Sequence, residues 1–107
     1  MDNPQATSPA PKDPAQEIFD QIVEKIIAQQ EAIIGPVAIE QAKRVNDLKI
    51  NWPQHDVDIS GNPQKAIDEL VQQYKELFGQ IAVETCKEAA SKMLSKLPSE
   101  QVPTSLR

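Results

Sequence analysis

The chain has 107 residues, with 11 Lys and Arg against 16 Asp and Glu, a formal net charge of −5. This length suits one domain that can bury a modest core without disulfides or metals. The negative charge repels phosphate backbones and anionic lipid headgroups, so nucleic acid is not an expected partner.

Targeting and membrane signals are the next features to consider. No apolar run approaches the roughly 20 residues that a membrane-spanning helix needs. The N-terminal sequence MDNPQATSPAPKDPA lacks the pattern of a secretory signal or a transit peptide. A single cysteine excludes an internal disulfide. We therefore expect a cytoplasmic protein with no membrane span.

Both ends of the chain are rich in proline and polar residues. Three prolines fall within residues 1–12, and two fall within 98–107. Such segments bury too little apolar surface to offset the entropy lost on ordering. The composition predicts two disordered tails around a single helical domain over residues 13–97.

The first helix is expected to begin at Asp13, which can cap it. Pro14 suits the first helical position, and Gln16 can complete a capping box. Apolar residues then recur at steps of three and four. Pro36 removes a backbone donor and pushes Gly35 away from helical angles. The helix therefore kinks, or ends and restarts, near Gly35.

A second start signal is Asn62-Pro63, again a capping side chain followed by proline. Helical spacing of apolar residues continues from Ala66 to Leu97, with Gly79 as the weak point. The second half of the chain is thus also predicted to be a helix with a glycine inside it.

The linker over residues 47–61 has a different pattern. Leu48, Ile50 and Trp52 alternate with polar residues, and two apolar residues further on do the same. This alternation predicts a short β-hairpin, with an irregular packed loop as the alternative. An isolated hairpin is marginal in water, so it must lie against the helices or pair with another chain.

The two helical segments resemble each other. Sliding the chain by 44 residues lays residues 32–45 over 76–89 without a gap. The identical pairs are Gly35/Gly79, Ala38/Ala82, Glu40/Glu84 and Lys43/Lys87. We interpret this as a duplication that gives two pseudo-symmetric helix–Gly–helix units, at about 13–46 and 62–95, built as four helices or as two long kinked helices.

Each unit has one apolar stripe. Face-to-face packing about an approximate dyad hides both stripes, within one chain or between two chains of a homodimer. Small residues near that axis permit close helix approach; they are Gly35, Ala38, Gly79 and Ala82. The alternative is that the glycines, with Pro36 beside the first of them, only break the helices.

Candidate catalytic and metal-binding residues each have a simpler explanation. Glu40 and Glu84 lack the Glu-x-x-His partners that a dinuclear metal site requires. Because a Lys lies three residues after each glutamate, we expect surface ion pairs instead. His55, Asp56 and Asp58 are too few and too loosely arranged for a transition-metal site, and a solvated loop is expected.

The cysteine and the glycines also lack the surroundings of a reactive or phosphate-binding site. Cys86 falls on an apolar face with no second cysteine, which favours a structural role. The three glycines are scattered and form no phosphate-binding loop. We therefore expect no enzyme, no cofactor and no metal.

Trp52 stands between Asn51 and Pro53 in the linker. It either plugs the edge of the core or forms an exposed anchor for a partner, because aromatic anchors are enriched at binding hot spots. The scarcity of aromatic residues favours the plug.

Residues 33–44, IIGPVAIEQAKR, resemble a short apolar-Gly-Pro-apolar-Ala helical element associated with regions that flank bacterial Ser/Thr kinase and signalling domains. The second copy has Gln80 where this element has proline, and the chain contains no kinase domain. The resemblance implies a signalling-associated interaction role.

The sequence has extensive apolar stripes and no recognisable catalytic, cofactor or metal motif. This combination predicts a non-enzymatic protein–protein interaction or regulatory module. We expect a helical homodimer that docks a protein partner of unknown identity through its apolar repeat faces or the Trp52 linker. The alternative is a carrier for a small apolar ligand or lipid, with Tyr74 or Cys86 at the wall of its cavity.

Overall fold

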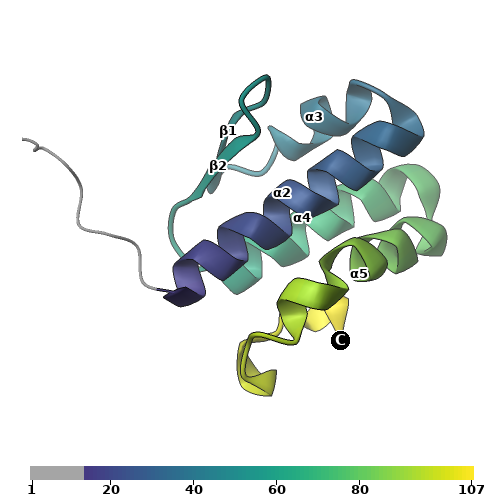
Figure 1. Ribbon diagram of the computed structural model, residues 1–107. Helices are drawn as coiled ribbons and strands as arrows, with labels where there is room; N and C mark the ends of the chain where they lie inside the picture. Colours follow the sequence, from purple (N-terminus) through teal and green to yellow (C-terminus); the bar gives the residue numbers. More distant parts are fainter. Residues whose placement is uncertain (1–13) are drawn as a thin grey trace, which may run out of the picture.

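The computed structural model describes residues 14–107, so the predicted cap at Asp13 and the predicted tail at 1–12 lie outside the described residues. Within 14–107 the chain forms four α-helices and, between them, a two-stranded antiparallel hairpin (Figure 1). The mainly helical fold and the hairpin in the linker are thereby confirmed.

The elements follow one another without long gaps. The helices are α2 (Pro14–Ile34), α3 (Val37–Ala42), α4 (Pro63–Phe78) and α5 (Gln80–Leu94); the strands are β1 (Leu48–Asn51) and β2 (Asp56–Ile59); two 3-10 turns follow, η1 (Ser99–Gln101) and η2 (Thr104–Leu106). No helix of residues 14–107 combines the length and hydropathy of a membrane span.

The predicted start of the second half is confirmed at α4. The Asn62 side chain accepts a 3.1 Å hydrogen bond from the Lys65 main-chain N–H, and Pro63 occupies the first helical position. The cap satisfies one of the main-chain donors that the first turn of a helix leaves free.

Each half of the chain turns at a glycine. Gly35 has φ +78° and Gly79 has φ +74°, values that L side chains rarely adopt. Added Cβ atoms would meet nothing within 4 Å at either glycine. These two glycines therefore break the helices, which was the alternative interpretation, and no close helix approach requires them. Residues 14–107 form four separate α-helices and not two long kinked ones.

The first helices of the two halves, α2 and α4, lie side by side at the centre (Figure 1). Helix α5 packs on both α2 and α4, and the short α3 likewise contacts both of these central helices. The halves differ in the lengths of both helices, because α2 and α3 have 21 and 6 residues, whereas α4 and α5 have 16 and 15.

The core is almost entirely aliphatic. It lies between α2, α4 and α5, and its fully buried apolar side chains include Ile22, Val23, Ile26, Ile27, Ala66, Ile67, Leu70, Tyr74 and Cys86. Ala38 and Ala82 are also buried at the starts of α3 and α5. Aliphatic residues at steps of three and four thus cover the inward faces, as helical amphipathicity requires.

The hairpin pairs Leu48 with Ile59 and Ile50 with Val57, and β2 packs against α2. Leu48, Val57 and Ile59 are buried on the face that meets the helices. This contact supplies the support that a two-stranded hairpin needs in water.

The expected disordered tail at 98–107 is wrong, because η2 packs against α4 and α5. Leu106 is 4% exposed, and the main-chain N–H of Ser105 donates a 2.9 Å hydrogen bond to Asp68 Oδ1. Helix α5 ends at Leu94, before Pro98, yet Pro103 and Leu106 are buried at the edge of the core, so the domain continues past residue 97.

Candidate functional site

Five large apolar side chains of residues 14–107 are exposed, and all lie beside the two glycine turns. We call them the corner patch: Ile33 is 54% exposed, Val37 41%, Leu77 44%, Phe78 45% and Ile81 65%. Both turns lie at the same end of the molecule, on the right in Figure 1. Exposed apolar side chains gathered in this way mark interaction sites more often than single ones do.

The corner patch draws on both halves of the chain at equivalent positions. Ile33 and Leu77 are 44 residues apart, as are Val37 and Ile81, while Phe78 corresponds to the half-buried Ile34. Successive helical residues point about 100° apart, so neighbours at the end of a helix cannot all face the core. At the end of α2, Ile33 is therefore exposed and Ile34 half-buried, whereas at the end of α4 both Leu77 and Phe78 remain in solvent.

A groove of about 260 Å³ lies within this patch, between the two turns. Its apolar lining comes from Ile33, Ile34, Phe78, Ile81 and Ala82, with Gln30 and Thr85 as the two polar members. A ligand in the groove would therefore meet mostly hydrocarbon.

The polar members of the groove already have partners. Gln30, which is 2% exposed, donates from Nε2 to Thr85 Oγ1 at 2.8 Å, and Thr85 Oγ1 donates to the Ala82 carbonyl at 2.9 Å. Gln30 also approaches Cys86 Sγ at 3.6 Å. These bonds fix the groove floor, since buried polar groups are costly to leave unpaired.

Cys86 and Tyr74 are buried behind the groove floor. Burial raises the pKa of the Cys86 thiol to about 12, against the opposing effect of its hydrogen bond from Gln30. Burial, and secondarily the neighbouring Cys86, also raises the pKa of Tyr74. A thiol that stays protonated is a poor nucleophile, which fits the structural role expected for Cys86.

Trp52 plugs the edge of the core, and its alternative role as an exposed partner anchor is not what the structure shows. The side chain is 8% exposed, and its indole N–H donates a 3.0 Å hydrogen bond to Glu31 Oε1. Its ring stacks on His55 with centroids 4.1 Å apart. Trp52 is therefore committed to contacts within the chain.

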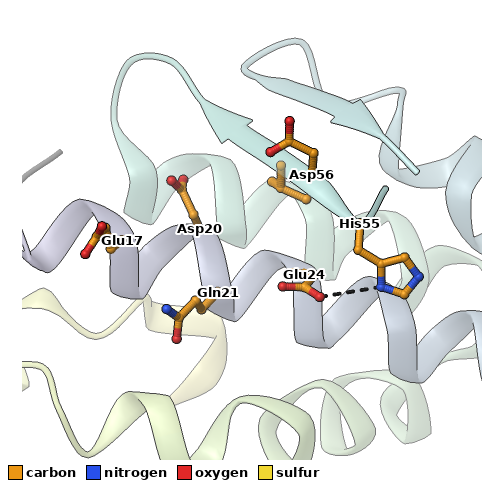
Figure 2. A pocket seen from close by; sticks show the side chains of 7 residues that line it. Glu17, Asp20, Gln21, Glu24, His55 and Asp56 are labelled. Carbon is orange, nitrogen blue, oxygen red and sulfur yellow. Dashed lines mark ion pairs between the residues drawn. The ribbon is translucent and has the colours of Figure 1, made fainter. Parts of the chain in front are cut away.

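A second hollow lies between α2 and the hairpin and is acidic (Figure 2). His55 Nδ1 approaches Glu24 Oε2 at 3.5 Å, and Glu17, Asp20 and Asp56 also line the hollow. Within residues 14–107 no group of three or more His, Cys, Asp or Glu is arranged to hold a metal ion. The hollow thus offers acidic groups without a defined coordination site.

The remaining predicted candidates lie on the surface. Glu84 pairs with Lys87 Nζ at 3.8 Å, which confirms the ion pair expected in the second half. Glu40 is exposed on α3, and Asp58 is exposed on β2 in register with Lys49.

Sequence reasoning missed the exposure of the corner patch. It expected the apolar stripes to be hidden within one chain or between two chains, with surplus apolar surface to dock a partner, but it did not single out these five side chains, which the structure leaves 41–65% exposed. Adjacent apolar pairs gave no signal of this exposure, because Ile22-Val23 and Ile26-Ile27 on α2 are equally apolar and fully buried.

No protein-family model, curated protein or solved structure matches the chain. The function is therefore argued from the geometry of the corner patch.

Proposed function

We propose that this chain is a non-enzymatic protein–protein interaction or regulatory module that docks a protein partner through the corner patch. The observation that carries the proposal is the gathering of five large, roughly half-exposed apolar side chains at one end of the molecule. The equivalent positions of Ile33 and Leu77, and of Val37 and Ile81, support a surface built from two related halves.

The size of the patch supports a protein partner. Half-exposure of five large side chains leaves roughly 400 Å² of apolar surface, within the range of about 300–600 Å² of the largest and often functional patches on monomers. Burying that surface contributes about 10 kcal/mol at about 25 cal/mol per Å², before the costs of association are subtracted. Association itself costs on the order of 4–15 kcal/mol, so contacts from the polar surroundings of the patch must add to this burial in a stable complex.

The carrier alternative has less support. Pockets for small molecules usually enclose roughly 300–1,000 Å³ and cover most of the ligand. The groove measures about 260 Å³ and lies at the surface. Tyr74 and Cys86, which the carrier hypothesis placed at a cavity wall, are fully buried in the packed core.

A photo-crosslinking experiment tests the docking. A photoreactive amino acid is placed at Ile33 in the patch, or at Gln54 in the exposed hairpin loop as a control, and the full chain is irradiated in its host. We expect a protein adduct from position 33 that is absent from position 54. Adding Ile81→Glu on the same chain should abolish the adduct. Equal labelling from both positions, or none from position 33, would refute the proposal.

A further inference from the structure

We infer that the protein seated on the corner patch is a second copy of this chain, held in a twofold dimer in which Ile81 of each copy enters the groove of the other. This inference rests on the proposed function and names the partner for it. Four observations support it, concerning the shape, the area, the charge and the available occupants of the patch.

The shape of the patch suits contact with itself. In a twofold dimer the same surface meets itself, so one patch must carry both a projection and a hollow. Ile81 is the most exposed of the five side chains at 65%, and it stands on the wall of the groove that Ile33 and Phe78 also line. A twofold axis beside Ile81 can therefore place each projection in the opposite hollow.

The area matches what a stable dimer needs. Specific interfaces bury about 800 Å² on each partner, and about 56–65% of that area is non-polar. The roughly 400 Å² of apolar surface in the patch thus supplies most of the non-polar share of one such interface. The surrounding polar rim supplies the rest.

The charges around the patch are of both signs. Lys75 and Glu76 precede Leu77 on α4. Glu84, Lys87 and Glu88 line a shallow hollow next to Ile81 on α5, where Glu84 and Lys87 pair with each other at 3.8 Å. A rim with both signs can pair with a rotated copy of itself, whereas a rim of one sign would select a partner of opposite charge. Repulsion from the overall charge of −5 is screened beyond about 8 Å at physiological salt.

The chain's own N-terminal segment is a poor alternative occupant. Residues 1–13 contain only one large apolar side chain, that of Met1. Helix α2 also carries the chain about 30 Å from Pro14 to the patch, at about 1.5 Å per residue. This segment therefore offers few apolar anchors for the five side chains of the patch.

Sedimentation velocity on the full chain, from about 1 µM to about 200 µM, tests the dimer. We expect the wild type to shift from monomer to dimer across this range. Ile81→Glu should raise the dissociation constant roughly tenfold or more, because it would bury a charge without a partner. Gln54→Glu adds the same charge in the hairpin loop and should leave the dissociation constant unchanged.

Circular dichroism on each variant confirms that it folds, as expected for substitutions of exposed side chains. A wild type that stays monomeric throughout, or an Ile81→Glu variant that dimerises as the wild type does, would overturn the inference. If the crosslink from position 33 then captures a different protein, the docking function stands and only the identity of the partner is wrong. If position 33 captures nothing, both proposals fail.

A mixed sample locates the contact. One copy is labelled with ¹³C and the other is unlabelled, and isotope-filtered NOEs report only contacts between copies. We expect NOEs between the Ile81 methyl groups of one copy and the Phe78 ring of the other. A dimer whose intermolecular NOEs lie elsewhere would contradict the assigned interface.

Discussion

The Tyr74 hydroxyl donates a 2.7 Å hydrogen bond to the main-chain carbonyl of Ala38, which joins α4 to α3. Gln30 lies 44 residues before Tyr74 and donates a 2.8 Å bond to Thr85, which joins α2 to α5. Equivalent positions on the two central helices therefore each fasten the second helix of the other half. The polar contacts in the core hold the two halves together.

Tyr74→Phe should lower the free energy of unfolding by about 1–2 kcal/mol, because it removes a buried hydrogen bond while keeping the ring. Urea denaturation followed by circular dichroism measures the change. Gln72→Ala, on the exposed side of the same helix, serves as the control and should change stability by less than about 0.5 kcal/mol. Equal effects of the two substitutions would show that the Ala38 bond contributes nothing.

The stability of the protein should fall at alkaline pH. Burial raises the pKa of Cys86 from 9.0 to about 12, so the folded state keeps a proton that the unfolded state loses. The resulting stabilisation is complete below about pH 9 and is lost as pH rises toward 12, by at most about 1.4 kcal/mol per pH unit. Tyr74, whose pKa burial also raises, adds a further loss above about pH 10.

Cys86→Ser isolates the contribution of the thiol, because serine is similar in size and does not titrate in this range. Urea denaturation at intervals between pH 7 and 10.5 should give a shallower decline for Cys86→Ser than for the wild type above about pH 9. Below about pH 8 the two slopes should agree. Parallel curves over the whole range would mean that the thiol does not stay protonated in the folded state.

Gly79→Ala should destabilise the protein by about 1–3 kcal/mol, because φ 74° with ψ −156° lies in a region that is essentially confined to glycine. No atom lies within 4 Å of the added Cβ, so the cost is one of backbone conformation and not of steric overlap. Gln80→Ala, at the next exposed position, should change stability by less than about 0.5 kcal/mol. A neutral Gly79→Ala would show that the turn adopts another conformation.

Trp52→Ala should lower the free energy of unfolding by about 3 kcal/mol, because it removes a buried ring from the edge of the core. Glu31→Gln keeps an oxygen acceptor for the indole N–H and should cost about 1 kcal/mol or less. Sedimentation under conditions in which Trp52→Ala is folded should give the wild-type dissociation constant. A selective loss of association would restore Trp52 as a partner anchor.

Local signals explain what the sequence could predict of the fold. The Asn62-Pro63 cap and the two glycine breaks depend on main-chain chemistry within a few residues, so the sequence displays them directly. The hairpin likewise follows from alternation between Leu48 and Ile59. The apolar stripe shared by the two halves likewise predicts that they pack against each other.

Tertiary packing decided what the sequence could not predict. Leu106 sits in a segment whose prolines indicate disorder, yet a contact with helices about 30 residues away buries it. The corner patch presents the reverse case, since Ile33 and Ile81 follow a core-like spacing but no element of residues 14–107 covers them. Periodicity predicts which face of a helix is apolar. Which apolar side chains remain exposed to solvent depends on how the helices pack.

The length of α2 separates two ends of the molecule. Its 21 residues place Pro14 about 30 Å from Ile34, at about 1.5 Å per residue. A fluorophore or affinity handle joined upstream of Pro14 therefore leaves from the end remote from the groove. Molecules immobilised by that handle would present the corner patch to proteins in the surrounding solution.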